Sequence, residues 1–255
     1  MTYKTIEWKG TPGVGDYMMG LNVAHHYSHQ YNIPVNFNIH WYHAEDHLHH
    51  FEDPETIVER LEYSHMFYKD QSKVTVKHIF NSTDTELWVK RFRGIHFSPD
   101  PNNRINSWIH KSTSFTQTVE NKVVIWRPIS NAETPRQWKN IIDNYTWDYI
   151  IKLLETVYGY HVVELTYRNP ISEVYYHLSN CNLVVCYDGM WHYVAKNFLK
   201  PMIVFSENDV TKFHTPNAIM LGRRNVQSFF NDFESNYCEL DNKLNTYKLQ
   251  IRDIL

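Results

Sequence analysis

A glycine-rich turn near the start of the chain places an aspartate where it could act as a general base. Residues 11–16 read Thr-Pro-Gly-Val-Gly-Asp, and Gly13 and Gly15 can adopt positive φ and let a ligand approach the backbone. A helix beginning here would offer unpaired N–H groups and the positive end of its dipole to an anion. Asp16 would then cap the helix or face a ligand beyond the preceding strand. A tight turn with an N-cap is the alternative, because the spacing is neither G-x-G-x-x-G nor that of a Walker A loop.

A second turn, far along the chain, combines an aspartate, a glycine and a histidine. It reads Asp188-Gly189-Met190-Trp191-His192 and follows an apolar run. Asp188 and His192 lie four residues apart, so they would share one face of a helix that starts in the turn. Gly189 permits close approach, and the first N–H groups of the helix would suit a phosphate or a sugar hydroxyl. The alternative is structural, with Asp188 as an N-cap and His192 as a core histidine bonded to the backbone.

Both turns must be held by strands and helices, and the first half of the chain predicts a βαβ order. Val35–Ile39 alternates with a period of two, which is typical of a strand. Met18, Leu21 and Ala24 lie three apart, which is close to helical spacing. The predicted elements are strand Thr5–Trp8, helix Tyr17–Tyr31, strand Val35–Ile39, helix 54–68 and strand Val74–Ile79.

The second half of the chain predicts another sheet. Its strands are rich in Val and Ile without alternation, and each is followed by a helix, which indicates a parallel sheet covered on both faces. Apolar residues at intervals of three or four predict a last helix over 239–255. The fold class is therefore α/β, with two Rossmann-like parallel-sheet domains at 1–118 and 119–238 followed by that helix. The predicted elements of the second domain are strand Lys122–Trp126, helix Trp147–Tyr158, strand His161–Leu165, helix Ile171–Leu178, strand Asn182–Cys186, helix Met190–Phe198 and strand Pro201–Phe205.

Length and composition limit the class of protein. The chain has 255 residues, of which 42% are hydrophobic and 21% are charged, the balance of a globular protein. A net charge of -3 without a block of Lys and Arg does not indicate binding to nucleic acid. Cys181, Cys186 and Cys238 show no CxxC spacing, which argues against a disulfide framework or a zinc site. With no signal-peptide core and no apolar stretch of about 18 residues, we expect a soluble, cytoplasmic protein.

The two turns, taken together and in this order, resemble the heptosyltransferase-like (glycosyltransferase family 9-like) enzymes. Those enzymes open with a strand, a Gly-x-Gly-Asp turn and a helix, which residues 13–16 match. Their second domain carries an Asp-Ser/Thr-Gly turn, a His-Leu-Ala-Ala helix and a Leu-Gly-Lys-Pro segment, which resemble residues 188–195 and 198–201. Their Lys-x-Trp motif resembles Arg136-Gln137-Trp138, and arginine can replace lysine as a partner of phosphate.

The resemblance covers part of the chain and has departures. It runs from about 122 to 206 in the second domain and over about 4–40 in the first. Counted back from the histidine, Gly189 matches the family's glycine, so Asp188 falls on the Ser/Thr position and Tyr187 on the Asp position. The displaced carboxylate implies a different donor sugar. The chain is also shorter than typical members of the family.

The resemblance implies a GT-B architecture, in which two domains face a cleft, and an inverting transfer from a nucleotide-diphosphate donor to an acceptor hydroxyl. It implies that Asp16 is the general base, while Arg136 and the helix N-terminus at Met190 stabilise the leaving diphosphate and Arg127 assists. The first domain would hold the acceptor, a glycan, lipid-linked glycan or other hydroxyl compound, and the second the nucleotide sugar. No metal and no cofactor is implied. The donor- and phosphate-binding residues would be Gly13, Gly15, Arg127, Arg136, Asp188, Gly189, Met190 and His192.

A histidine-rich stretch carries a separate metal hypothesis. His43, His47 and His50 share one helical face, and Glu45 or Asp46 could join them. The pattern is not His-Glu-x-x-His and directly follows a predicted strand, so we expect a solvated or interface loop instead.

Two other functions remain open from the sequence. One is a sugar-nucleotide epimerase of the same fold, and the other is a catalytically silent sugar-nucleotide binder. Asp16 argues against the silent binder, because a protein that only binds has no need of a base. Lys196 and the pair Arg223-Arg224 are weaker candidates for phosphate contact, and we expect them to be solvated.

Overall fold

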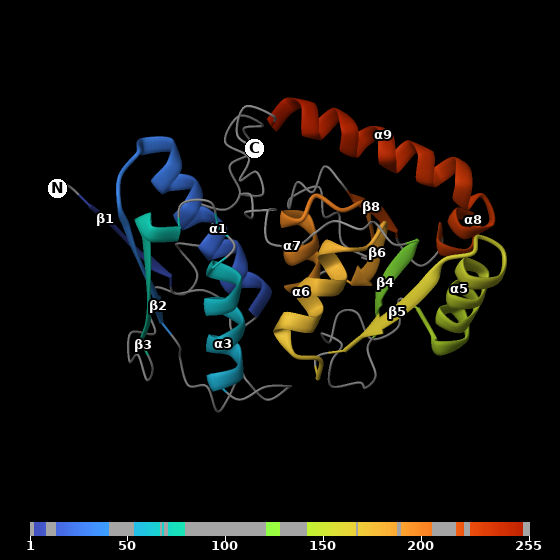
Figure 1. Ribbon diagram of the computed structural model, residues 1–255, viewed down its shortest axis with the longest axis horizontal. Helices are drawn as coiled ribbons and strands as arrows, with labels where there is room; N and C mark the ends of the chain where they lie inside the picture. The colour runs from blue at the N-terminus through green and yellow to red at the C-terminus, as the bar shows by residue number, and fades with distance from the viewer. Residues whose placement is uncertain are drawn as a thin grey trace. The chain divides into compact units, whose positions relative to one another are not determined.

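The computed structural model describes residues 3–8, 14–40, 54–66, 68, 71–79, 121–127, 142–166, 168–187, 190–205, 218–221 and 225–251. The chain divides into two compact units, unit 1 (Met1–Ser112) and unit 2 (Thr113–Leu255). Each unit contains a parallel β-sheet with helices packed against it (Figure 1). The predicted α/β class with two parallel sheets is therefore confirmed.

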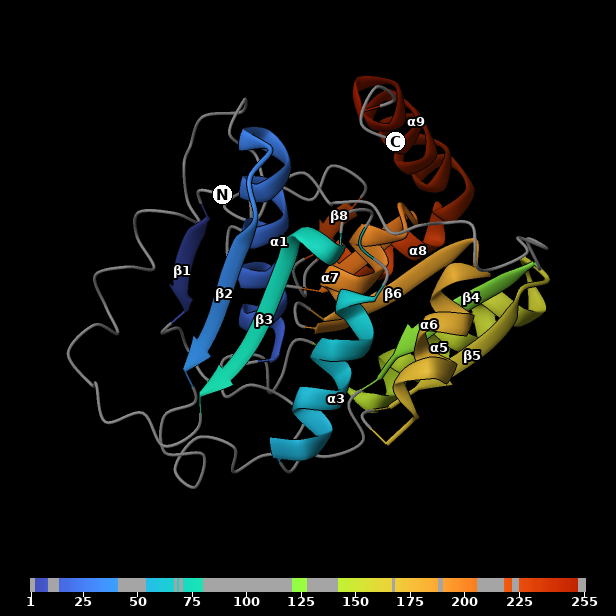
Figure 2. The same ribbon diagram turned by 60° about the vertical axis from the view of Figure 1, so that its left-hand side comes forward.

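Unit 1 is built on a three-stranded parallel sheet. Its elements are β1 (Lys4–Trp8), α1 (Val14–Tyr31), β2 (Val35–His40), α3 (Pro54–His65), the 3-10 turn η1 (Gln71–Lys73) and β3 (Val74–Ile79). The strand order is β1-β2-β3, and all neighbours run parallel. Helices α1 and α3 lie on one side of the sheet in both views (Figures 1 and 2). The predicted βαβ order of this half is confirmed.

The core of unit 1 follows from the period-two pattern of β2. Val35, Phe37 and Ile39 are at most 1% exposed, whereas the residues between them are partly exposed. Helix α1 packs against β2 and buries Met18 and Leu21, which lie three residues apart. Full burial of each such apolar side chain stabilises the fold by roughly 1.5–3 kcal/mol. The alternate residues of β2, which are polar, project from the opposite face of the sheet.

Unit 2 is built on a five-stranded parallel sheet. Its elements are β4 (Lys122–Trp126), α5 (Asn144–Thr156), β5 (His161–Leu165), α6 (Ile171–Ser179), β6 (Leu183–Tyr187), α7 (Met190–Asn197), β7 (Met202–Phe205), β8 (Ala218–Leu221), α8 (Val226–Asn231) and α9 (Phe233–Ile251). The strand order is β5-β4-β6-β7-β8, with every neighbouring pair parallel. Figure 1 shows α6 and α7 on one side of this sheet and α5 and α8 on the other.

Both faces of the unit 2 sheet are covered, as its apolar strands predict. Every residue of β6 and β7 is buried. One face packs against α5, α8 and α9 through a cluster that includes Val185, Ile203, Trp147, Phe230 and Phe233. On the other side, α7 packs against β6, β7 and α6. This two-sided burial explains why the strands lack polar alternation.

Some boundaries in unit 2 differ from the sequence-based expectation. The last helix begins at Phe233, not near 239. Phe233 and Leu240 are both buried, so the apolar face of this helix starts earlier in the sequence than predicted. Strand β8 and helix α8 are short elements that the sequence patterns did not predict. Among the helices of the described residues, none is both long and apolar enough to cross a bilayer.

Candidate functional site

The candidate site lies at the carboxyl edge of the unit 2 sheet. The chain passes from β4 through α5 to β5 on one side, and then through α6 to β6 on the other side of β4. The direction of winding therefore reverses at β4 and β6. In open α/β sheets, ligands bind in the crevice beyond the carboxyl ends of the strands at such a switch point. The residues found there are Trp126 and Arg127 at the end of β4 and Tyr187 at the end of β6.

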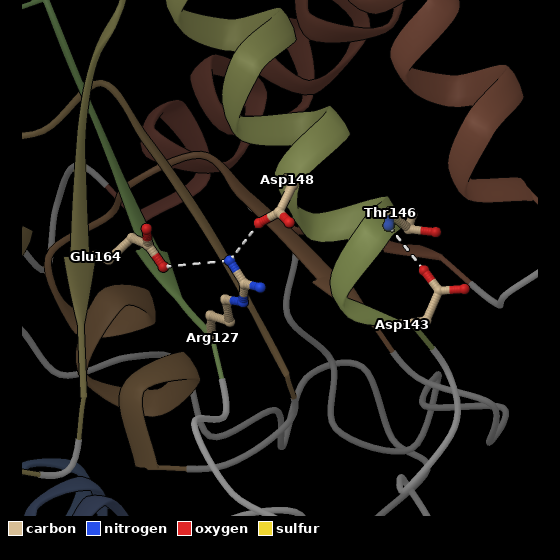
Figure 3. Close-up of polar contacts among 5 residues, drawn as sticks. All are labelled: Arg127, Asp143, Thr146, Asp148 and Glu164. Carbon is tan, nitrogen blue, oxygen red and sulfur yellow. Dashed lines mark hydrogen bonds and ion pairs between the residues drawn. The ribbon is translucent and has the colours of Figure 1, made fainter.

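Arg127 is held between two carboxylates from different elements. Its Nη1 donates to Oδ1 of Asp148 on α5 at 2.7 Å and lies 3.9 Å from Oε2 of Glu164 on β5 (Figure 3). The side chain of Arg127 is 21% exposed, whereas those of Asp148 and Glu164 are 66% and 46% exposed. A guanidinium has five N–H donors, so a phosphate could still be met by donors other than those on Nη1. The two exposed carboxylates could accept hydrogen bonds from hydroxyl groups.

The start of α5 lies beside this cluster and is already capped. Oδ1 of Asp143 accepts a hydrogen bond from the backbone N–H of Thr146 at 2.7 Å (Figure 3). Asp143 has extended backbone angles, with φ -80° and ψ 168°, which is the ordinary geometry of an N-cap. This cap occupies one of the first N–H groups of α5. An anion at the switch point would therefore bind more favourably to the first N–H groups of α7, the helix that follows β6.

Aromatic side chains line the sheet beneath the switch point. The rings of Trp126 and Tyr187 meet edge to face with centroids 6.5 Å apart, and Tyr187 meets Trp147 in the same way at 5.8 Å. Burial raises the pKa of the Tyr187 phenol, and hydrogen bonds to Trp147 and to the backbone of Ile142 partly offset that rise. The Nε1 atom of Trp126 is buried and has no hydrogen-bond partner among the described residues. A buried indole N–H in this position is a donor that a bound ligand could satisfy.

The residues predicted from the second turn are only partly described. Met190 is the first residue of α7, as expected for a helix that starts in the turn. His192 is 0% exposed, the burial expected of a core histidine, and it therefore contacts a ligand only if that ligand reaches into the core. Asp188 and Gly189 lie outside the described residues. Their roles stay predictions.

The residues predicted from the glycine-rich turn are likewise described only in part. Helix α1 begins at Val14, three residues before the predicted Tyr17, so Gly15 and Asp16 lie inside its first turn and Asp16 does not occupy the N-cap position. The conformation of the Asp16 side chain and the placement of Gly13 lie outside the description. Arg136, Arg223, Arg224 and the histidine-rich stretch 41–50 also lie outside the described residues, and the side chain of Lys196 is not described.

The sequence motifs did not identify three polar groups of this site. Asp148 and Glu164 reach Arg127 from α5 and β5, and neither carries a motif of its own. The indole of Trp126 was noted only as part of a strand. Within the described ranges, no three His, Cys, Asp or Glu side chains are grouped closely enough to hold a metal ion.

Comparison with solved structures identifies proteins with a similar fold. The iron-containing dodecameric glycosyltransferase TibC from enterotoxigenic E. coli matches with a TM-score of 0.52 and 11% identity, over 85% of this chain and 61% of TibC. The chain has the fold of a glycosyltransferase. At lower similarity, the E. coli heptosyltransferase WaaC with ADP-2-deoxy-2-fluoro heptose matches with a TM-score of 0.48 and 11% identity, over 91% of this chain and 99% of WaaC. E. coli ADP-heptose lps heptosyltransferase II matches with a TM-score of 0.49 and 13% identity, over 94% of this chain and 100% of that protein.

The likeness to TibC confirms the resemblance to the heptosyltransferase-like enzymes at the level of the fold. The chain spans 61% of the length of TibC. No protein-family model matches the sequence, and a search of the curated proteins finds no significant match.

Proposed function

We propose that the protein is a glycosyltransferase that moves a sugar from a nucleotide-diphosphate donor to an acceptor hydroxyl. The observation that carries the proposal is the switch point of the unit 2 sheet, where Arg127, the start of α7 and the Trp126 indole N–H, which has no partner among the described residues, come to adjacent strand ends. Cationic and N–H donors at a switch point suit a nucleoside diphosphate. The fold shared with the glycosyltransferase TibC supports the same assignment.

The proposed reaction is an inverting displacement. The oxygen of the acceptor hydroxyl forms a bond to the anomeric carbon while the bond from that carbon to the phosphate oxygen breaks. The nucleoside diphosphate leaves with the electron pair, and a general base takes the hydroxyl proton. Arg127, Arg136 and the N-terminus of α7 would stabilise the charge that develops on the diphosphate. We propose that the transfer needs no metal, although TibC is described as iron-containing.

Thermal unfolding in a panel of nucleoside diphosphates and nucleotide sugars tests the donor site. A ligand at about a hundred times its dissociation constant adds about 2.7 kcal/mol to the free energy of unfolding. We expect one nucleotide to stabilise the protein, and Arg127→Ala and Arg136→Ala to reduce that effect. Lys152→Ala, which removes an exposed charge from α5, should leave it unchanged. A protein that is folded yet stabilised by no member of the panel would contradict the proposal.

Product analysis separates the proposed transferase from its rivals. The nucleotide sugar that stabilises the protein is incubated with it in the presence of EDTA, and the products are followed by NMR. With water as the acceptor, the expected result is release of nucleoside diphosphate and of free sugar whose anomeric configuration is inverted. Conversion of the sugar while it stays attached to the nucleotide would identify an epimerase. Binding without any conversion would identify a silent binder.

A further inference from the structure

The two carboxylates beside Arg127 are engaged to different degrees. Oδ1 of Asp148 accepts a hydrogen bond from Nη1 of Arg127 at 2.7 Å (Figure 3). Oε2 of Glu164 lies 3.9 Å from the same nitrogen, which is close enough for electrostatic attraction but too far for a hydrogen bond. Among the described residues Glu164 has no other polar partner, and its side chain is 46% exposed. Asp148 therefore holds the arginine, whereas both oxygens of Glu164 can still accept hydrogen bonds from a ligand.

The parallel register of β4 and β5 brings Glu164 to the switch point. Glu164 pairs with Ile125, and Arg127 follows two residues after Ile125, so the side chains of Glu164 and Arg127 project from the same face of the sheet. Glu164 is one residue from the carboxyl end of β5. Strand β4 lies between β5 and β6, and two strand spacings amount to about 10 Å. A nucleotide is long enough to extend from the end of β6 to Glu164.

The charges around Glu164 favour a neutral hydroxyl group over an ion. A carboxylate only accepts hydrogen bonds, so the ligand group that contacts Glu164 must be a donor. The guanidinium of Arg127 would repel an ammonium group placed on Glu164, and the two carboxylates would repel a phosphate placed there. A hydroxyl group meets neither repulsion. A vicinal diol can donate one charge-assisted hydrogen bond to each oxygen of the carboxylate.

The polar groups of the turn after β5 are engaged with one another. Oδ1 of Asn169 accepts a hydrogen bond from the backbone N–H of Thr166 at 2.7 Å and another from the Thr166 hydroxyl at 3.1 Å. That hydroxyl in turn accepts a hydrogen bond from the backbone N–H of Arg168 at 3.1 Å. A ligand would have to break these hydrogen bonds to use the same groups. Glu164 can bind a ligand at this strand end without such a loss.

We propose that Glu164 recognises the ribose of the nucleotide donor by accepting hydrogen bonds from its 2′- and 3′-hydroxyl groups. The inference rests on the proposed transferase function, in which the diphosphate of the same nucleotide contacts Arg127 and the start of α7. Arg127 keeps donors other than Nη1 for that diphosphate. In dinucleotide-binding α/β domains, an acidic residue makes a comparable contact to the ribose 2′-hydroxyl. The donor is therefore the sugar derivative of a ribonucleoside diphosphate, not of a deoxyribonucleoside diphosphate.

Nucleotides that differ only in the ribose hydroxyl groups test the proposal. Calorimetric titration compares ADP, GDP, UDP and CDP with their 2′,3′-dideoxy analogues, and dTDP is added to the series. For the base that binds most tightly, the dideoxy analogue should bind the wild-type protein at least about 10-fold more weakly, because hydrogen bonds to a charged group are lost. The base and the diphosphate are the same within each pair. The ratio of the two Kd values therefore reports on the hydroxyl groups alone.

Glu164→Gln tests whether this carboxylate is the group that recognises the diol. Loss of a negative charge should strengthen the contact with the diphosphate equally in both nucleotides of a pair, so this effect cancels in the ratio. Loss of the charge-assisted hydrogen bonds should affect only the ribonucleotide, so the ratio should fall towards one. Glu155→Gln removes an exposed carboxylate from the last turn of α5 and should keep the wild-type ratio. Thermal unfolding without ligand checks that both variants are folded.

The possible results distinguish failure of this inference from failure of the proposed function. If no nucleoside diphosphate or nucleotide sugar binds the folded protein, the proposed function fails. If the wild-type protein binds a ribonucleotide and its dideoxy analogue alike, or binds dTDP most tightly, only the inference fails. A wild-type ratio that persists in folded Glu164→Gln would also overturn the inference, because another group then recognises the ribose. A ratio that is lost in Glu164→Gln and kept in Glu155→Gln would support both.

Discussion

Nη1 of Arg127 lies 2.7 Å from Oδ1 of Asp148, a residue 21 positions further along the chain. With Glu164 at 3.9 Å from the same nitrogen, the three groups carry one positive and two negative charges at neutral pH. Arg127 can therefore offer full positive charge to a phosphate only when the phosphate takes over part of its contact with the carboxylates. The cluster makes the affinity for a diphosphate depend on the carboxylates as well as on the arginine.

Replacement of Asp148 should separate these two contributions. Asp148→Asn removes one negative charge beside Arg127, so we expect it to raise the affinity for the stabilising nucleoside diphosphate several-fold. The pair is exposed, so the free energy of unfolding should fall by no more than about 1 kcal/mol. Calorimetric titration and urea unfolding measure the two effects, and Glu155→Gln, at the far end of α5, controls for net charge. Weaker binding by Asp148→Asn would show instead that Asp148 positions the arginine or contacts the ligand.

Substitutions in the core beneath the site should lower the free energy of unfolding much more than substitutions at the surface. Trp147 is 1% exposed and meets both Tyr187 and Phe205 edge to face, at 5.8 and 5.1 Å between ring centroids. Trp147→Ala should lower the free energy of unfolding by about 3–5 kcal/mol, measured by urea denaturation. Tyr145, on the same helix, is 82% exposed, and Tyr145→Ala should change stability by no more than about 0.5 kcal/mol. Similar losses in the two variants would contradict the packing described.

Strands were predictable from the sequence where a short run is rich in β-branched residues, even where the strand is only partly buried. Lys122–Trp126, His161–Leu165 and Val74–Ile79 have the bounds that the apolar runs predict. The first residues of helices were less predictable. A first turn made of polar residues lacks the regular spacing of apolar residues from which a helix is predicted. Helix α5 begins at Asn144, three residues before the predicted Trp147, since Asp143 supplies the cap.

The candidate sites were predictable only where a motif is local. Arg127 and Met190 stand where the strand and turn patterns place them. The partners of Arg127 could not be predicted, because they depend on the register between β4 and β5, in which Ile125 pairs with Glu164.

A group of histidines in unit 1 should make stability depend on pH. Burial lowers the pKa of His65 and of His78, and the nearby Glu62 carboxylate offsets part of each shift. The ring of His25 stacks on Tyr68 at 3.8 Å and lies 5.1 Å from that of His65. Because the unfolded chain takes up these protons first, the free energy of unfolding should fall as the pH drops below about 6.5. Above that pH the contribution is fully present.

Urea unfolding between pH 7.5 and 5.5 measures this dependence in a range above the titration of ordinary carboxylates. His65→Gln and His78→Gln should each reduce the slope of the free energy of unfolding against pH. Each variant lacks one imidazole that binds a proton more readily in the unfolded chain than in the folded protein. His29→Gln should keep the wild-type slope, since His29 is exposed. A wild-type protein equally stable at both ends of the range would contradict the prediction.

The cap of α5 offers a test that separates stability from ligand binding. Asp143→Ala removes the acceptor of the Thr146 N–H, which lies 2.7 Å from it, and should lower the free energy of unfolding by about 1 kcal/mol. Asp143→Asn keeps an acceptor but loses the charge at the helix N-terminus, so it should cost only about 0.3–1 kcal/mol, and less at high salt. Because the cap already occupies this N–H, a phosphate has no place there, and Asp143→Asn should leave nucleotide affinity unchanged. A marked gain in affinity would show that the start of α5, rather than that of α7, faces the diphosphate.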